Sequence, residues 1–373
     1  MERAKERGAR GERIGSAFIR QTAAFLCLIG IVALASACGG NGGRPTPTPA
    51  PADTGTASGG EKKETEAADT EGESAGQREL VKVTQVTNWF AEPEHGGQYA
   101  ALMKGFYEEA GLDMTILPGG PQVSATQIVG SGNAEFGMTQ ADSLLLAREQ
   151  GIPIVAIAAT FQKNPQGLIY HADQDIRDFP DLNGRTVFVA PGAAYWEYLK
   201  KKYDLKVEER SYTGSLAGFI SDPASVTQGY ITSEPFSLKQ QGIETGMLLH
   251  ADAGYDPYAN VLFTTERMIR ERPDLVRAFI EASVKGWDYY KDHYEEIHPF
   301  LREYNPDLTL EAMEYGAKAQ MDLVYGGDAA EGGVGIMTEE RWRTLADQML
   351  EIGMLKEDPD VTKAFTNEFL PAR

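Results

Sequence analysis

The order of hydrophobic and polar positions after Leu80 indicates alternating strands and helices. Residues 80–86 alternate between apolar and polar side chains, as a half-exposed strand does. Residues 97–110 predict a helix that ends at Gly111, and residues 113–117 predict a second short strand. This alternation is typical of α/β proteins.

The alternation continues toward the C-terminus, where helices become more frequent than strands. Residues 154–158 are a continuous apolar run, which predicts a strand of a parallel sheet that is covered on both faces. Residues 185–189 predict another strand. The last third has helical periodicity in three segments, residues 273–290, 309–323 and 338–350. We therefore expect an α/β fold in which the last helices pack around one of two domains.

Two segments share one local pattern. Residues 136–142 and 228–234 each combine a strand, a small or hydroxyl residue at a helix start and an acid in the first helical turn. Ligands of open α/β sheets bind beyond the C-terminal ends of strands, so two facing copies would share a cleft. Its opposite walls would then carry Gln140, Asp142, Ser233 and Glu234. Unrelated α/β units also repeat in this way, so the pattern alone leaves both interpretations open.

The N-terminal segment has the pattern of a bacterial export signal. A basic start precedes an apolar run at residues 23–35, which is too short to span a bilayer comfortably. Ala35-Ser36-Ala37-Cys38 resembles a lipobox, with the usual leucine displaced by one place to Leu34. We expect residues 1–37 to be a signal peptide and Cys38 to be the lipidated first residue of the mature chain. Cleavage to a soluble secreted protein is the alternative.

Residues 38–79 have the composition of a tether. A Pro-Thr repeat is followed by Gly, Ser, Glu and Lys, with almost no aliphatic or aromatic side chain to offset the entropy of ordering. We expect a disordered leash between the membrane surface and the folded body.

Charge and cysteine content exclude several classes of function. The 373 residues include 35 Lys and Arg against 55 Asp and Glu, a formal net charge of −20. Such a surface repels phosphate backbones, so we expect no nucleic-acid partner. The two cysteines, Cys27 and Cys38, both precede residue 40, which excludes a disulfide scaffold and a cysteine-based zinc site.

Several segments resemble the thiamin-pyrimidine-synthase-like family of substrate-binding proteins. They run in order through most of residues 81–290, and they are residues 88–99, 105–112, 119–121, 135–137, 147–151 and 228–235. The resemblance implies a two-domain periplasmic-binding-protein fold of type II with a ligand cleft between the domains. It also implies delivery of the ligand to the permease and ATPase subunits of an ABC importer. The implied domains are residues 80–166 with 262–373 (domain I) and residues 167–261 (domain II).

One departure from the family bears on catalysis. The family's eukaryotic synthases use an early histidine, here matched by His95, and a cysteine cluster after the second domain. The matching segment, residues 254–261, contains no cysteine. Common catalytic motifs are also absent from the sequence. We therefore expect a binding protein with no catalytic residues, no cofactor and no bound metal. A synthase-like enzyme and a sensory or adhesive lipoprotein remain alternatives.

Aromatic and amide side chains dominate the matched segments. Rings stack on flat heteroaromatic ligands, while amides and carboxylates bind ring N–H and C=O groups. For each ring the alternative is core packing, and for His95 and Glu234 it is a structural hydrogen bond and a helix cap. Of the pair Tyr195 and Trp196, we expect one ring to face the cleft. The candidate ligand-binding residues are Asn88, Trp89, His95, Tyr99, Gln140, Asp142, Tyr195, Trp196, Tyr230, Glu234 and Tyr258.

The same segments favour an uncharged ring ligand. Arg148 is the one basic residue within them and lies at the far end of a predicted helix, whereas a sulfonate or nitrate binder needs cationic or hydroxyl donors. The resemblance favours riboflavin, with a formylaminopyrimidine thiamin precursor as the alternative and a sulfonate- or nitrate-type ligand after that.

Overall fold

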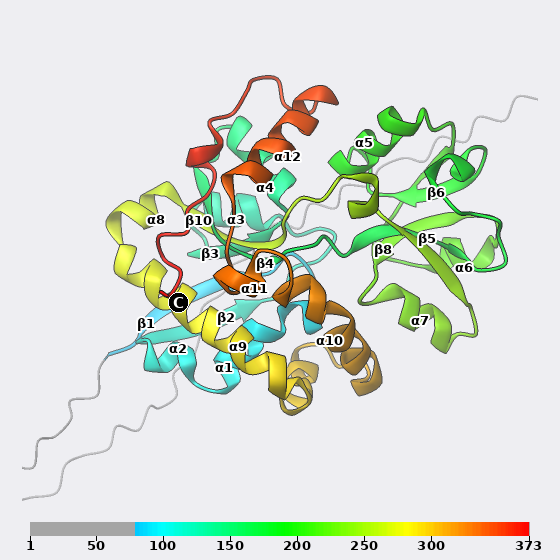
Figure 1. The fold of residues 1–373 in the computed structure, drawn as a ribbon. Coiled ribbons are helices and arrows are strands. Elements are labelled where there is room, and N and C mark those ends of the chain that lie inside the picture. The colour runs from blue at the N-terminus through cyan, green and yellow to red at the C-terminus, as the bar shows by residue number, and fades with distance from the viewer. Residues whose placement is uncertain (1–78, 373) are drawn as a thin grey trace, which may run out of the picture. The chain divides into compact units, whose positions relative to one another are not determined.

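The computed structural model describes residues 79–372, which form two five-stranded sheets with helices around each (Figure 1). The first sheet has the strand order β2 (Leu112–Leu117), β1 (Val81–Val86), β3 (Phe136–Thr139), β10 (Ala259–Thr265) and β4 (Ile154–Phe161). The second has the order β7 (Glu208–Ser211), β6 (Thr186–Val189), β8 (Val226–Tyr230), β5 (Gln166–His171) and β9 (Thr245–Leu249). The α/β fold expected from the sequence is confirmed.

The two sheets have the same topology. In the first sheet β1 is parallel to β2 and β3, while β10 is antiparallel to β3 and β4. In the second, β6 is parallel to β7 and β8, while β5 is antiparallel to β8 and β9. The repeated segments at 136–142 and 228–234 begin on β3 and at the end of β8, the middle strand of each sheet. The repeat therefore falls on equivalent positions of two similar lobes.

Strand β4 differs from the prediction in its direction. It is buried along its whole length, as an apolar run at 154–158 requires, but it pairs antiparallel with β10 at the edge of the sheet. Backbone bridges from Ala156 to Phe365 and from Ala159 to Gly335 cover it. The expectation of a parallel strand was wrong because an apolar run reports burial of both faces and carries no information on strand direction.

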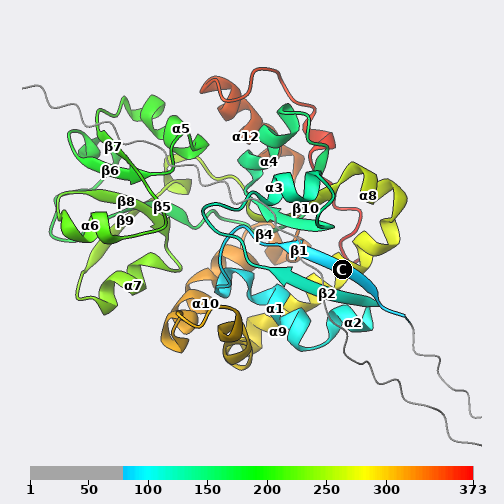
Figure 2. The ribbon, with the colours of Figure 1, turned by 180° about the vertical axis from the view of Figure 1, so that it is seen from behind.

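Helices cover both faces of the first sheet (Figures 1 and 2). One face carries α1 (Gly96–Met103), α2 (Phe106–Glu109), α9 (Pro273–Tyr304) and α10 (Leu310–Tyr325). The other carries α3 (Ala125–Gly130), α4 (Ala141–Glu149) and α12 (Glu339–Glu351). Shorter helices are α8 (Glu266–Glu271), α11 (Ala329–Gly332), and the 3-10 turns η1 (Pro93–His95), η2 (Phe179–Leu182), η3 (Ala251–Ala253) and η4 (Val361–Lys363). The second sheet carries α5 (Ala194–Tyr203), α6 (Ala217–Ser221) and α7 (Glu234–Gln240).

Glycine determines two details of the helices. The single helix predicted at residues 97–110 is two helices, because the chain breaks at Gly105, whose φ is 75°. Long helix α9 lies close against α1, since a Cβ on Gly286 would overlap the carbonyl oxygen of Gly97. Helices α9, α10 and α12 fulfil the three C-terminal predictions, and α9 continues to Tyr304 through a non-helical residue, His293.

The chain crosses between the sheets at residues 162–165 and 250–258. Asn164 joins the two crossings, because its backbone N–H donates to Asp256 Oδ1 (2.8 Å) and its side-chain amide donates to the carbonyl of Pro257 (3.1 Å). The expected boundary between residues 261 and 262 falls inside β10, a strand of the first sheet. We propose that the second lobe ends before Ala259.

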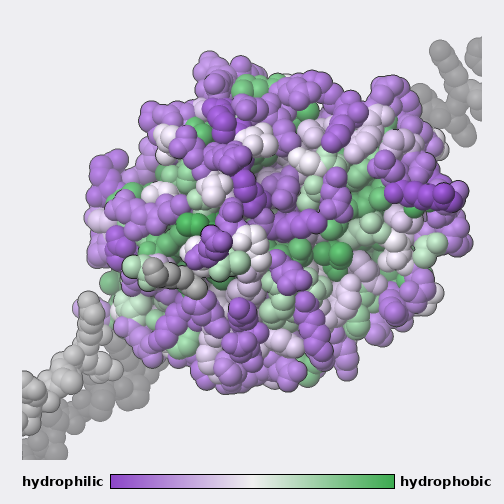
Figure 3. All heavy atoms as spheres, in the orientation of Figure 1, coloured by the Kyte–Doolittle hydropathy of each residue, from purple (hydrophilic) through white to green (hydrophobic). Residues whose placement is uncertain are grey.

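The predicted signal peptide, Cys38 and nearly all of the predicted tether lie outside the described residues. Within residues 79–372, no helix is both long and apolar enough to cross a membrane. Hydrophilic side chains cover most of the face shown in Figure 3, in keeping with the acidic composition.

Candidate ligand-binding cleft

A cavity of about 580 Å³ lies between the two sheets. Its walls include the segments that follow β1, β2, β3, β6 and β7, together with the end of β8 and the start of α7. These are the C-terminal ends of the parallel strands in both lobes, where open α/β sheets place their ligands. The volume lies within the range of about 300–1,000 Å³ that is usual for small-molecule sites.

Trp89 supplies one aromatic surface of the cavity. It follows β1, and its ring meets Phe90 edge to face with 5.5 Å between centroids. The second lobe comes close to it, since a Cβ on Gly214 would lie 3.1 Å from Pro121 Cγ and 3.8 Å from Trp89 Cη2. Gly214 also has a φ of 86°, a conformation that favours glycine. Its missing side chain therefore lets the second lobe approach the tryptophan.

His95 holds one wall in place through a chain of hydrogen bonds. The backbone N–H of Glu92 donates to His95 Nδ1 (3.4 Å), so the ring proton is on Nε2, which donates to Asn88 Oδ1 (3.0 Å). The amide of Asn88 donates to Asn260 Oδ1 (2.9 Å), and that of Asn260 donates to the carbonyl of Glu94 (3.0 Å). Burial lowers the pKa of His95 to about 4. The ring is therefore uncharged at neutral pH and gives the cavity no positive charge.

Three carboxyl groups gather beside this chain. Glu92 and Glu94 come from the segment after β1, and Glu234 is the first residue of α7 in the second lobe. Glu94 accepts a hydrogen bond from the Thr232 hydroxyl, while Glu234 accepts one from the backbone N–H of Tyr230 (2.7 Å). Burial is the main reason that the pKa of all three is raised, for Glu234 to about 7.

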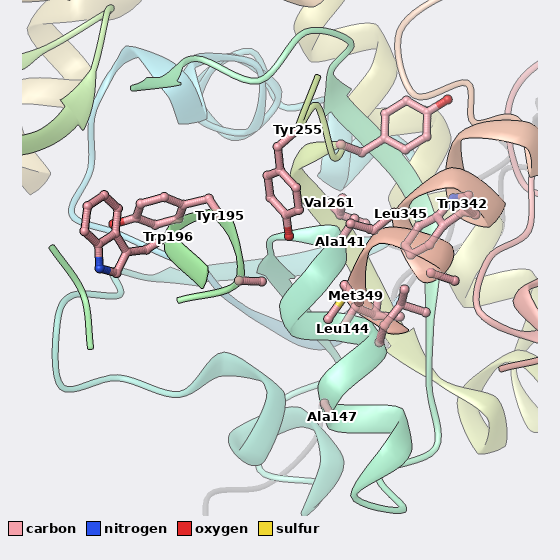
Figure 4. Packing of buried hydrophobic residues seen from close by; sticks show 14 of the residues in the cluster. Ala141, Leu144, Ala147, Tyr195, Trp196, Tyr255, Val261, Trp342, Leu345 and Met349 are labelled. Atoms are coloured by element: carbon pink, nitrogen blue, oxygen red, sulfur yellow. The ribbon is translucent and has the colours of Figure 1, made fainter. Parts of the chain in front are cut away.

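The middle of the cavity joins the lobes through Gln140 and Tyr230. The Gln140 side-chain amide donates to the Tyr230 hydroxyl across the cleft. Asp142, near the start of α4, accepts hydrogen bonds from the Tyr255 hydroxyl (3.0 Å) and the Ser143 N–H (2.6 Å), and burial raises its pKa. Figure 4 shows Tyr255 beside the N-terminal end of α4.

The structure brings eight of the eleven candidate residues to this cavity. They are Asn88, Trp89, His95, Gln140, Asp142, Tyr195, Tyr230 and Glu234. Ser233 lines it too, so the four residues expected on opposite walls all face one cleft.

Three candidates are buried in the core instead and do not line the cavity. Tyr99 packs against Tyr304 with 4.8 Å between ring centroids, and Trp196 belongs to the second lobe's core (Figure 4). The Tyr258 ring lies under the Arg341 guanidinium, 3.9 Å from it, and its hydroxyl accepts from the Thr338 N–H (3.0 Å). Core packing accounts for all three, and we leave them out of the site.

Many other residues on the cavity wall were not among the candidates. They include Glu92, Glu94, Tyr212, Gln228 and Asn260. Glu92 and Glu94 lie inside the matched segment 88–99. Two acids in a loop expected to enter the cleft could have been recognised as candidates from the sequence. No sequence pattern points to Tyr212 or Asn260, and only the structure shows that they line the cavity. Among residues 79–372 no group of three or more His, Cys, Asp or Glu side chains could hold a metal ion.

Comparison with known proteins agrees with this geometry. The sequence profile of the family described as NMT1/THI5 like matches residues 92–297. The riboflavin-binding protein RibY of Chloroflexus aurantiacus is 27% identical over 310 residues, which cover 79% of this chain and 88% of RibY. The 4-amino-5-hydroxymethyl-2-methylpyrimidine phosphate synthase of Legionella pneumophila is 24% identical, covering 78% and 92%. The periplasmic aliphatic sulphonate binding protein SsuA of Escherichia coli has a similar fold, with a TM-score of 0.59 at 13% identity over 77% of this chain and 91% of SsuA.

Proposed function

Because the chain belongs to the NMT1/THI5-like family, we propose that it is an extracytoplasmic substrate-binding lipoprotein of an ABC importer. It captures a flat heteroaromatic vitamin, riboflavin, in the cleft between its lobes and delivers it to the permease and ATPase subunits. The lipid on Cys38 and the tether hold it at the membrane surface. It performs no catalysis, in keeping with the absence of cysteine from residues 254–261.

The observation that carries this proposal is the chemistry of the cavity wall. Trp89 offers a ring face, and Gln140, Gln228 and Asn88 offer amide groups, while no lysine or arginine lines the cavity within the described residues. A ring face with a few polar groups suits a flat heterocycle, and the lack of cations disfavours a sulfonate or nitrate. The similarity to RibY adds independent support for riboflavin.

A thiamin pyrimidine precursor is the second candidate. Glu92, Glu94 and Glu234 line the cavity, and a carboxyl group can accept the amino N–H of an amino-pyrimidine edge and, when protonated, donate to the ring nitrogen beside it. Several relatives that are 24% identical to this chain are synthases of a pyrimidine phosphate. This similarity supports the pyrimidine ligand, and a synthase-like reaction, as alternatives.

Titration with riboflavin tests the proposal directly. The full chain, extracted in detergent, is unfolded to release bound ligand, refolded, and titrated while flavin fluorescence is followed. Saturable quenching at submicromolar concentration, with riboflavin recovered unchanged, is the expected result. Absence of quenching by protein with a native circular dichroism spectrum would exclude riboflavin, and calorimetry with the formylaminopyrimidine would follow.

A further inference from the structure

The three carboxyls of the cleft have no counter-charge. None of the ion pairs within residues 79–372 includes Glu92, Glu94 or Glu234, and the adjacent His95 ring is uncharged at neutral pH. Acids from both lobes therefore face one cavity without a protein cation to balance them.

The carboxyls also have unused capacity to accept hydrogen bonds. Glu94 is only 2% exposed, yet its Oε2 has no hydrogen-bond partner, while its other oxygen accepts from Thr232. Leaving a buried acceptor unpaired costs about 1–3 kcal/mol, more for a charged group. Glu234 accepts from the Tyr230 N–H and from the Tyr212 hydroxyl (3.4 Å), and each carboxylate has about four acceptor positions.

Gly229 leaves space for the Glu234 carboxyl beside the cavity. A Cβ on Gly229 would lie 2.5 Å from Ile169 Cδ1, and 3.0 Å from the Glu234 carboxyl carbon and from its Oε2. A side chain at this position would therefore displace the carboxyl, and glycine leaves it beside the cavity.

We propose that Glu92, Glu94 and Glu234 form a subsite that takes the donor-rich end of the ligand and rejects an anionic end. This inference rests on the proposed function, since it assigns one part of that ligand to one end of that cleft. The matching chemistry is a group with several O–H or N–H donors. Two sources supply it, the polyol chain of a flavin and the amino-pyrimidine edge of a thiamin precursor.

Ligand analogues separate the subsite from the rest of the cleft. If a polyol occupies it, FMN, which adds a phosphate to that chain, binds about 100-fold more weakly than riboflavin at about pH 8.5, because above the raised pKa of Glu234 that carboxyl is ionised and like charges meet. Lumiflavin, which keeps the isoalloxazine ring but carries a methyl group in place of the chain, loses about 10-fold or more because the acceptors stay unpaired. If the pyrimidine occupies it, the analogue without the 4-amino group suffers a loss of about the same size.

Conservative variants then connect the discrimination to these residues. Glu92→Gln and Glu234→Gln, each checked for folding by circular dichroism, should bring the FMN penalty below about 10-fold because a neutral amide no longer repels the phosphate. Glu281→Gln, an exposed position on α9, is the control and should leave every ratio unchanged. A purely structural role would weaken all ligands in proportion and leave the ratios as they were.

The outcomes distinguish this inference from the function on which it rests. Riboflavin that binds no better than FMN and lumiflavin, or an aminopyrimidine that binds no better than its deaminated analogue, overturns the subsite and leaves the importer function standing. Unchanged ratios in both glutamine variants overturn it as well. If neither ligand class binds the folded protein, the proposed function fails and the subsite fails with it.

Discussion

The side-chain amide of Gln140 donates a hydrogen bond to the hydroxyl of Tyr230, which joins two residues at the ends of equivalent strands in different sheets. Gln140 directly follows β3, and Tyr230 is the last residue of β8. Because β3 and β8 occupy the same place in two sheets of the same topology, this bond lies near the centre of the cleft. It is one contact that an opening of the cleft would break.

A double-mutant cycle on Gln140→Ala and Tyr230→Phe measures this contact. We expect each single variant to weaken ligand binding and the two effects to be non-additive by about 0.5–1.5 kcal/mol, the usual worth of one hydrogen bond. Calorimetric affinities give the coupling energy. Ser131→Ala, on the exposed C-cap of α3, should change neither affinity nor coupling. Additive effects would show that the bond is not formed in the liganded protein.

Glu234 should make the unliganded protein less stable as the pH rises. Burial raises its pKa from 4.5 to about 7, so between these values the folded state binds more protons than the unfolded state. The contribution of Glu234 to the free energy of unfolding is therefore fully present below pH 4.5 and is lost as the pH rises through 7. The neighbouring Glu92, Glu94, Tyr212 and Tyr230 face the same carboxyl.

Glu234→Gln isolates that contribution. Buried histidines act in the opposite direction, since His95 and His298 have pKa values lowered to about 4 and their contribution is lost as the pH falls from 6.5. The histidines contribute equally to both proteins. Subtracting the variant's melting temperature from that of the original protein therefore removes their contribution to the pH dependence. The difference should become more negative, or less positive, from pH 5 to pH 8. A difference that does not change with pH would contradict the raised pKa.

Sequence pattern was sufficient for most of the elements and for part of both walls of the cleft. Strands at 80–86, 113–117 and 185–189 follow from alternation, and the repeat at 136–142 and 228–234 placed four polar residues on facing walls. These successes depend on short-range order, where side-chain period and helix starts report local conformation directly.

The failures required information that only the fold contains. Tyr99, Trp196 and Tyr258 were candidates because they are aromatic, but whether a ring faces a cleft or a core depends on what packs against its helix or strand. Glu92 and Glu234 lie far apart in the chain and meet only because the two lobes face each other. The direction of β4 likewise depends on β10, which follows it by almost a hundred residues.

Arg341 should stabilise the crossings between the lobes. Its Nη1 donates to the carbonyl of Gln162 (2.6 Å), its Nη2 donates to that of Asp256 (2.9 Å), and its guanidinium lies over the Tyr258 ring. Arg341→Ala should lower the free energy of unfolding by about 2–4 kcal/mol, because two hydrogen bonds from a charged group and a cation–π contact are lost. Urea denaturation measures this loss.

A neighbouring arginine on α12 provides the control for that experiment. Arg343 pairs with Asp347 and Asp358 at the surface and touches neither crossing, so Arg343→Ala should cost less than about 1 kcal/mol. Equal losses in the two variants would show that Arg341 has no special part in holding the crossings.

Cys38 should determine where the protein is found in a bacterial host. If it carries the lipid, the full chain sediments with membranes, while Cys38→Ala leaves the membrane fraction or keeps its signal peptide, because the anchor cannot be attached. Cys27→Ala, inside the predicted signal peptide, should fractionate as the original chain does. Fractionation with metabolic labelling by a fatty acid gives the answer. Labelled Cys38→Ala protein would contradict the lipobox interpretation.

Trp89 should contribute more to ligand binding than to folding. Its ring lines the cavity, is only partly buried and has Phe90 as its aromatic neighbour, so Trp89→Ala removes a stacking surface without opening the core. We expect affinity to fall by about 1–3 kcal/mol with little change in melting temperature. Trp89→Phe, which keeps a smaller ring face, should recover part of the loss. A well-folded Trp89→Ala protein with unchanged affinity would place the ligand's ring elsewhere in the cleft.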